Sequence, residues 1–284
     1  MLWIVTDSGQ ELATSPSHGL YVADLEVLVN GQKVDHVLDR EEFFALQAEP
    51  ANQMTTSQPS PAVFEDLFKE LLKNENDEIL CVLLSARFSG CLNSARLAAD
   101  GNPKIHLYDS RNVCLPQTLL VSEALRLRDE GKDAQTIMAE LDDLKKRVRF
   151  MAVLPSLKYL EKGGRISPAK AAIAKLAGIK PILWLNEEGE IDVARKCRGY
   201  KKAIHEMMDL ALKMGIDPEA PMVFGHMGTE DKNGCAAYLQ QLYEEATGNH
   251  CRKEPIPISL ALGVHSGPEG VAMAFFVPEK TAQN

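Results

Sequence analysis

Residues 79–95 read ILCVLLSARFSGCLNSA, and the architecture that we expect for the whole chain follows from this stretch. Six consecutive apolar residues, 79–84, are typical of a strand that is buried on both faces, as in a parallel sheet. The strand ends at Ser85, and Ser89 and Gly90 open a helix. Ligands of parallel sheets bind at the carboxyl ends of the strands. Because a helix N-terminus with hydroxyls beside it suits an anion, we expect an anion site here.

Ser89 also has a purely structural interpretation. Serine before a helix is a frequent N-cap, which accepts a hydrogen bond from the helix's own N–H groups. From the local pattern alone, capping and ligand binding both remain open for Ser89.

The composition predicts a globular protein with two domains. The chain has 284 residues, of which 45% are hydrophobic, enough for a large core. It contains no apolar run of 18 residues, and residues 1–7 lack the pattern of a signal peptide, so we expect a cytoplasmic location. Six cysteines lie far apart with no CxxC pair, which argues against a zinc site and against a disulfide framework.

The charge is unevenly distributed. The net charge of −9 disfavours nucleic acid as a partner. Residues 145–202 nevertheless carry 15 Lys and Arg against 5 Asp and Glu, whereas the rest of the chain carries 16 against 35. This basic segment is either a solvated face or a docking surface for an acidic partner.

The remaining patterns predict an N-terminal α/β domain, residues 1–149. A short strand precedes Asp7-Ser8-Gly9, Asp39 begins a helix over 40–47, and Ser60-Pro61 begins another. A strand at 105–110 is followed by two amphipathic helices. Strands that alternate with helices indicate a parallel sheet.

Residues 150–284 have a different pattern, which predicts an α+β domain. The segments 181–185 and 190–195, joined by Asn-Glu-Glu-Gly, read as a hairpin. We expect a helix over about 229–247 and further strands at residues 222–227, 258–264 and 271–277. The fold class that we predict is therefore α/β with two domains, a parallel-sheet domain followed by an α+β domain.

Three further polar residues are candidates for a ligand site. Thr56 and Ser57 lie in residues 48–58, a segment with no hydrophobic period, where an ordinary polar loop is at least as good an interpretation. His265 follows the strand expected at 258–264, among glycines that would let the backbone approach a ligand. For His265 the structural and ligand interpretations are evenly balanced.

The motifs of common enzyme classes are absent. No serine has the G-x-S-x-G frame, and the chain has no P-loop, no dinucleotide-binding G-x-G-x-x-G and no H-E-x-x-H. The turn hydroxyls and one histidine could hold a small anion without attacking it.

Six blocks of sequence resemble the DegV family, in the order found in that family and spread over nearly the whole chain. The blocks begin at residues 5, 56, 89, 159, 180 and 265, and they read VTDS, TSQPSP, SG, YLEKGGRIS, KPIL and HSGP.

The resemblance implies a two-domain α/β fold that binds a long-chain fatty acid. The protein would be the non-catalytic binding subunit of a bacterial fatty acid kinase, whose separate ATP-binding subunit phosphorylates the carboxylate. It would need no cofactor, and transient membrane contact is an open expectation. The residues that the resemblance assigns to the carboxylate are Thr56, Ser57, Ser89, Gly90 and His265.

Arg165 and Arg198 match family positions that are associated with docking of the kinase subunit. Two other hypotheses about the function remain open. One is a hydrolase or transferase that uses His265 as a base on an acyl or phosphoryl substrate. The other is a carrier of a different amphipathic anion.

Overall fold

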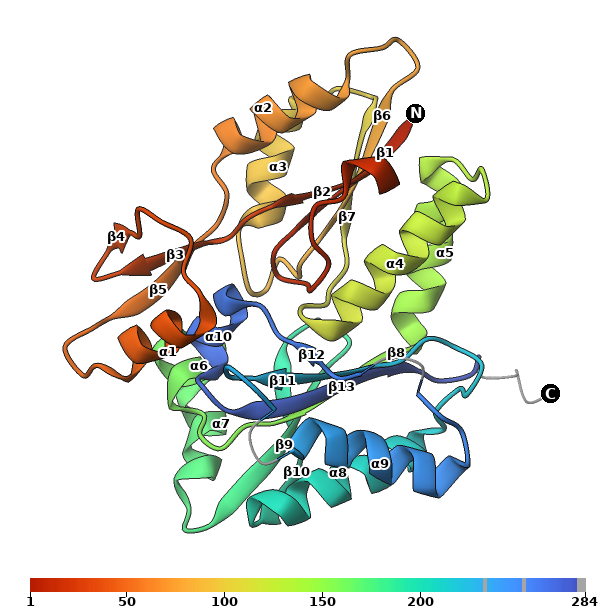
Figure 1. The fold of residues 1–284 in the computed structure, drawn as a ribbon. Helices are drawn as coiled ribbons and strands as arrows, with labels where there is room; N and C mark the ends of the chain where they lie inside the picture. The colour runs from red at the N-terminus through yellow and green to blue at the C-terminus, as the bar shows by residue number, and fades with distance from the viewer. Residues whose placement is uncertain (232–233, 252–253, 280–284) are drawn as a thin grey trace.

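Two large β-sheets with their helices make up most of the molecule, and Figure 1 shows the N-terminal sheet above the C-terminal one. The computed structural model describes residues 1–231, 234–251 and 254–279. The N-terminal sheet has the order β2-β1-β6-β7, and each neighbouring pair is parallel. Its strands are β1 (Leu2–Asp7), β2 (Leu20–Ala23), β6 (Glu78–Leu83) and β7 (Ile105–Asp109). The predicted parallel sheet is therefore confirmed.

Strand β6 is buried on both faces, as its apolar run predicts. Ile79, Cys81 and Leu83 pack with α2 and α3. Leu80 and Val82 point the other way and pack with α4 and α5. The four helices are α2 (Pro61–Leu71), α3 (Cys91–Ala99), α4 (Leu115–Asp129) and α5 (Ala134–Arg147). The alternation follows from the two-residue period of a strand.

A small antiparallel sheet extends from the N-terminal domain. It has the order β4-β3-β5, and its strands are β3 (Glu26–Val29), β4 (Gln32–Lys33) and β5 (Met54–Ser57). The expectation that residues 48–58 lack regular structure is wrong for β5, whose pairing with β3 no local pattern reveals. The predicted helix at 40–47 is confirmed as α1 (Arg40–Ala48), where Asp39 accepts a hydrogen bond from the Glu42 N–H. A short 3-10 turn, η1 (Pro16–His18), precedes β2.

The C-terminal sheet is mixed and has the order β10-β9-β8-β13-β11-β12. All of its pairs are antiparallel except β11 with β12. Its strands are β8 (Val148–Val153), β9 (Ile179–Leu185), β10 (Ile191–Arg198), β11 (Val223–Met227), β12 (Ile256–Pro257) and β13 (Gly270–Phe276). The predicted hairpin is confirmed as β9 and β10. Two helices, α8 (Tyr200–Met214) and α9 (Cys235–Thr247), pack on one face of this sheet. Residues 232–233, in the helix expected over 229–247, lie outside the described residues.

The strand expected at residues 258–264 is wrong. In the described residues 254–264, strand β12 pairs with β11 through Ile256 and Pro257, and the chain then forms the helix α10 (Leu260–Ser266). Short apolar runs do not distinguish a strand from a buried helix. His265 therefore lies in the last turn of a helix and not at the end of a strand. The other short helices are α6 (Lys158–Lys162), α7 (Pro168–Ala172) and η2 (Ile173–Lys175).

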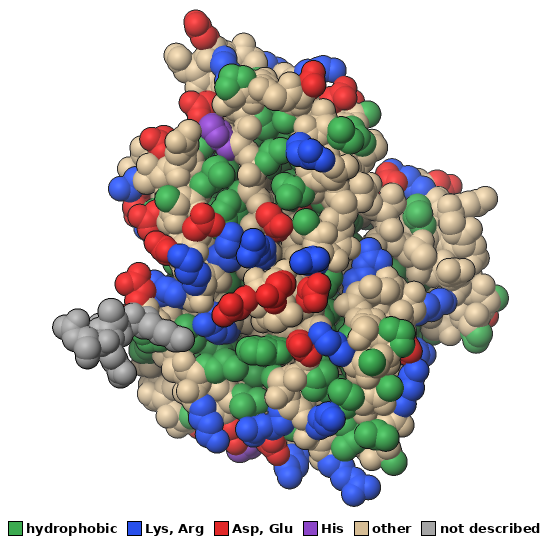
Figure 2. All heavy atoms as spheres, turned by 180° about the vertical axis from the view of Figure 1, so that it is seen from behind, with side chains coloured by type: hydrophobic (Ala, Val, Ile, Leu, Met, Phe, Trp, Pro, Cys, Tyr) green, Lys and Arg blue, Asp and Glu red, His purple; other side chains and the backbone are tan. Residues whose placement is uncertain are grey.

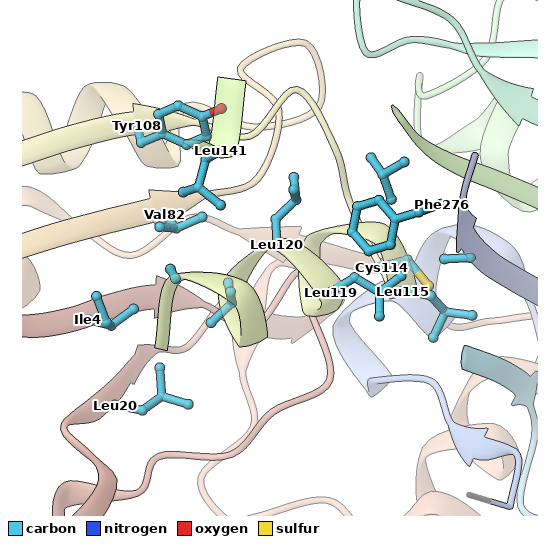
Figure 3. Packing of buried hydrophobic residues seen from close by; sticks show 14 of the residues in the cluster. Ile4, Leu20, Val82, Tyr108, Cys114, Leu115, Leu119, Leu120, Leu141 and Phe276 are labelled. Carbon is cyan, nitrogen blue, oxygen red and sulfur yellow. The ribbon is translucent and has the colours of Figure 1, made fainter. Parts of the chain in front are cut away.

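Helix α4 joins the cores of the two sheets. Figure 3 shows Leu115, Leu119 and Leu120 of this helix between Ile4 of β1 and Phe276 of β13. All five side chains belong to one buried cluster. Our division of the chain between residues 149 and 150 stays a prediction, and this position falls inside β8. The shared core fixes the two sheets against each other and so fixes the space between them.

Candidate functional site

The space between the two sheets contains a cavity of about 380 Å³. At the border of this cavity, turns that follow strands of the parallel sheet contact the C-terminal half of the chain. The Ser85 hydroxyl, just after β6, donates to the Gly189 carbonyl at 3.2 Å. The Ser259 hydroxyl donates to the Ser8 carbonyl, just after β1, at 3.0 Å. The cavity therefore lies at the carboxyl ends of the parallel strands, as expected.

Most of the cavity wall is apolar. The N-terminal domain contributes Leu84, which follows β6, and Val113, which precedes α4. The facing strands of the C-terminal sheet contribute Ala152, Leu183 and Ala272. These side chains come from elements that are far apart in the sequence. Because they are all apolar, the part of the wall that they form cannot donate or accept side-chain hydrogen bonds. The wall is suited to an apolar ligand, and the volume falls within the range of about 300–1,000 Å³ of small-molecule pockets.

A hydrogen bond between Thr56 and His265 closes one polar end of the cavity. The Thr56 Oγ1 atom on β5 lies 2.8 Å from Nε2 of His265 on α10. Burial, with a smaller contribution from the charge of Arg165, lowers the pKa of His265 to about 4. The imidazole is therefore neutral at pH 7. When its Nε2–H donates to Thr56, the threonine hydroxyl keeps its own proton for a ligand.

Ser89 and Gly90 lie at the start of α3 and line the same cavity. The Ser89 hydroxyl accepts a hydrogen bond from the Cys91 N–H at 3.2 Å, so the capping interpretation applies, although the N-cap position itself is Gly90. A hydroxyl that accepts from a backbone N–H can still donate its own proton to an anion. A Cβ atom on Gly90 would lie 2.3 Å from Gln58 Oε1, so glycine leaves room for the side chain of Gln58, which follows β5.

Ser57 differs from its neighbour Thr56. Its hydroxyl donates to the Gln58 carbonyl at 3.3 Å, and it is absent from the described residues that line the cavity. Successive side chains of a strand point to opposite faces, which separates the two adjacent hydroxyls. The structure thus brings together Thr56, Ser89, Gly90 and His265 of the predicted carboxylate residues and leaves Ser57 out.

Arg165 lies at the polar end as well. Its guanidinium donates from Nε and Nη2 to the Phe88 carbonyl at 3.2 and 3.0 Å, and from Nη1 to the Gly163 carbonyl. Burial lowers the pKa of Arg165, but guanidinium stays charged at pH 7. Among the described residues, no carboxylate forms an ion pair with it. A partly buried cation without a carboxylate partner favours an anionic ligand.

Arg198 is far more accessible. It is exposed at the end of β10, in the basic segment 145–202. Figure 2 shows Lys and Arg side chains gathered over the lower part of the face seen from behind, where the C-terminal sheet lies. The two arginines that the resemblance pairs therefore have different environments, one at the cavity and one on the surface.

Two buried carboxyl groups support the turns around the cavity. Asp7 accepts from the Leu84 and Gly9 N–H groups, each at 2.8 Å, and burial raises its pKa to about 6. Glu11 accepts from the Ser259 N–H at 2.6 Å, and burial raises its pKa to about 7. The first ties β1 to β6, and the second ties the N-terminal domain to the start of α10, which carries His265.

Sequence reasoning missed two features of the site. It did not place Arg165 at the cavity, because only the folded chain brings the turn after α6 next to Phe88. It also missed the strained turn at Cys114, which lines the cavity with φ +66° and ψ −142°. No local signal marks a cysteine in a conformation that favours glycine.

The described parts of the chain contain no group of three His, Cys, Asp or Glu side chains that could hold a metal ion. In the same residues, every helix is too short or too polar to cross a membrane.

Comparisons with known proteins find relatives that match nearly the whole chain. A family profile described as uncharacterised proteins of the DegV family matches residues 1–278. A DegV domain-containing protein of Caldanaerobacter subterraneus is 32% identical over 280 residues, which cover 96% of this chain and 97% of that protein.

Two solved structures have the same fold. A fatty-acid-binding DegV family protein of Thermus thermophilus is 29% identical, with a TM-score of 0.84 and coverage of 97% of this chain and 99% of that one. The Streptococcus pneumoniae fatty acid kinase B3 protein, crystallised with linoleic acid, is 22% identical, with a TM-score of 0.82 and coverage of 98% and 99%. The match over nearly the whole length shows that this chain belongs to the DegV family.

Proposed function

We propose that this protein binds a long-chain fatty acid and presents its carboxylate to a separate ATP-dependent kinase subunit. The observation that carries the proposal is the Thr56–His265 hydrogen bond at the polar end of an otherwise apolar cavity. The Thermus thermophilus relative, which binds fatty acid, supports the choice of ligand. The kinase role is supported by the six sequence blocks.

The geometry assigns the two parts of the ligand to different walls. The acyl tail would fill the apolar part of the cavity, and each buried CH₂ contributes about 0.8 kcal/mol, or roughly 11 kcal/mol gross for ~14 methylenes. The carboxylate would accept hydrogen bonds from Thr56 and Ser89, close to the positive charge of Arg165. Each such bond contributes about 1.5–3 kcal/mol, partly offset by desolvation. Tail burial sets the affinity, and the polar end sets the orientation.

The transfer step would take place on the partner. A carboxylate oxygen forms the bond to the γ-phosphorus of ATP while the bond to the β–γ bridging oxygen breaks, which releases ADP and an acyl phosphate. This chain would hold the carboxylate in place and would be non-catalytic by itself. We place the complex in the cytoplasm, with transient membrane contact for lipid exchange, and we propose Arg198 of the basic surface as a docking residue.

The pKa of His265 supports binding over general-base catalysis. An efficient general base has a pKa near the working pH, whereas His265 titrates at about 4. Its Nε2 atom is also engaged with Thr56. These two observations favour a role in orienting the hydroxyl.

Mass spectrometry of lipids extracted from the purified protein tests the proposal. We expect close to one fatty acid per chain, and uptake of palmitate or oleate after delipidation. Wild-type protein alone, given acyl esters, acyl phosphates or ATP, should show no turnover. A protein that neither copurifies with fatty acid nor takes it up would contradict the proposal. Turnover without a partner would favour the hypothesis of a hydrolase or transferase.

A further inference from the structure

Helix α1 lies beside α10, the helix that carries His265 (Figure 1). Its residues Arg40, Phe43 and Gln47 are spaced three and four apart, so they share one face of the helix. Gln47 Nε2 donates to the Gly263 carbonyl of α10 at 2.9 Å. A Cβ atom on Gly263 would lie 3.1 Å from Phe43 Cε1. The two helices therefore pack closely along this face.

The guanidinium of Arg40 binds two backbone carbonyls near the ends of α10. Its Nε atom donates to the Gly228 carbonyl at 2.7 Å, and Nη1 donates to the Ile258 carbonyl at 2.8 Å. Ile258 lies two residues before α10 begins. A Cβ atom on Gly228 would lie 2.8 Å from the carbonyl oxygen of Pro268, so the Gly228 turn contacts the chain just after α10. One side chain thus joins the segments on both sides of this helix.

The peptide group between Ile258 and Ser259 is hydrogen-bonded on both sides by charged side chains. Arg40 donates to its carbonyl, and Glu11 accepts from its N–H at 2.6 Å. The charge of Arg40 also favours the ionised form of Glu11, because it lowers the pKa that burial raises. The Ser259 hydroxyl adds a hydrogen bond to the Ser8 carbonyl. These contacts fix the plane of the peptide group from which α10 starts.

The direction of α10 determines where His265 lies relative to Thr56. At about 1.5 Å per residue, His265 lies roughly 9 Å beyond Ser259, so a tilt of about 10° would move it by roughly 1.6 Å. A shift of that size would break the 2.8 Å hydrogen bond to Thr56. Strand β5, which carries Thr56, is tied to α1 in turn, because Asn52 Nδ2 donates to the Leu46 carbonyl at 3.0 Å. Helix α1 therefore contacts the supports of both partners in this bond.

We propose that Arg40 is a positioning residue, which together with Glu11 fixes the peptide group before α10 and so holds His265 within reach of Thr56. Arg40 is absent from the described residues that line the cavity, so it would act on a ligand through α10 and not by contact. The binding assay for this inference rests on the proposed function, whereas a second readout on His265 does not.

Isothermal titration of delipidated protein with palmitate gives the first readout. Arg40→Gln removes the charge and the planar fork of donors. We expect palmitate to bind it about tenfold more weakly, the lower end of the effect of one hydrogen bond to a charged group. Arg40→Lys keeps the charge opposite Glu11 but cannot reproduce the fork, and we expect a loss of about threefold. If Arg40→Gln does not fold, Arg40→Lys provides the test.

Arg128 supplies the matched control. It lies on α4, its side chain is 10% exposed, and it donates from Nη1 to the Gly19 carbonyl at 3.2 Å. Gly19 precedes β2, at the edge of the parallel sheet opposite to the cavity. Arg128→Gln therefore removes a cationic carbonyl donor of the same kind without changing the contacts of α10. We expect a loss of stability in urea unfolding and wild-type affinity for palmitate.

The imidazole ¹⁵N NMR signals of His265 give the second readout, in protein without ligand. At pH 7 the ring is neutral, and a hydrogen bond from Nε2–H to Thr56 favours one tautomer. We expect the two nitrogen signals to move toward each other in Arg40→Gln, because the tautomers mix when this bond is lost. The signals are identified by their absence in His265→Gln, and they should stay unchanged in Arg128→Gln.

The outcomes separate this inference from the proposed function. If palmitate does not bind the wild-type protein, the proposed function fails, and the imidazole signals still test the role of Arg40. Unchanged His265 signals in both Arg40 variants would overturn the inference, whether or not palmitate affinity falls, because Arg40 would then not position the ring. Equal changes in Arg128→Gln would overturn it as well, since they would reflect a general loss of stability.

Discussion

Gly163 allows a direct test of how His265 is positioned. Its φ of −77° suits any residue, so Gly163→Ala introduces no backbone strain. The new Cβ, however, would lie 2.3 Å from His265 Nδ1, and real Cβ atoms essentially never approach another atom below 3.0 Å. The imidazole must therefore shift by at least 0.7 Å, the difference between these distances. Because Thr56 already lies at 2.8 Å on the other side, the ring has to turn out of that hydrogen bond.

The expected loss follows from the bond that is broken. Without His265 as its donor, the Thr56 hydroxyl is no longer oriented toward the carboxylate. One hydrogen bond to a charged group contributes about 1.5–3 kcal/mol, so palmitate should bind roughly 10- to 150-fold more weakly. Isothermal titration of delipidated protein measures the affinity, and urea unfolding measures the stability.

Gly164 supplies the matched control. Its φ is +71°, and a Cβ there would have nothing within 4 Å. Gly164→Ala should therefore cost about 1–2 kcal/mol of stability and leave palmitate affinity unchanged. If folded Gly163→Ala binds palmitate like the wild type, His265 does not orient the head group. An equal loss of affinity in Gly164→Ala would attribute the effect to loosening of the turn.

Three other predictions concern the turns and the surface. In urea unfolding, Cys114→Gly should be more stable than Cys114→Ala by about 1–3 kcal/mol, because φ +66° with ψ −142° favours glycine. If the alanine variant is instead the more stable of the two, residue 114 does not lie in a strained turn. Burial raises the pKa of Glu11 from 4.5 to about 7, so its contribution to stability is full below pH 4.5 and is lost as the pH rises through 7. The stability of Glu11→Gln relative to the wild type should therefore increase by up to ~3 kcal/mol from pH 4.5 to pH 8, and a pH-independent difference would count against the buried carboxyl. Arg198→Glu should slow association with the kinase subunit in surface plasmon resonance without changing palmitate affinity; loss of lipid binding instead would remove Arg198 from the docking surface.

The parallel sheet and its helices could be predicted from the sequence because their signals are local. The six apolar residues at 79–84 indicate a strand that is buried on both faces. Asp39, followed three residues later by Glu42, indicates the start of α1. The hairpin of β9 and β10 is likewise marked by its turn. The sequence blocks also indicated the family, and with it Thr56, Ser89 and His265 as site residues.

Local signals did not reveal β5 or α10, the two elements that carry the central hydrogen bond of the site. β5 is a strand only because β3 pairs with it, and α10 is an apolar run whose periodicity is compatible with either structure. Arg165 was expected on a docking surface, since nothing near it in sequence places it beside Phe88.

Tertiary structure alone determined which hydroxyls face the cavity and in which direction the pKa of His265 is shifted. Thr56 and Ser57 are equivalent in sequence, but pairing in the small sheet directs only Thr56 toward His265, 209 residues away. The low pKa of His265 arises from burial and from the charge of Arg165. Burial and charge–charge distances depend on how distant segments pack, and a local pattern of residues carries no information about that packing.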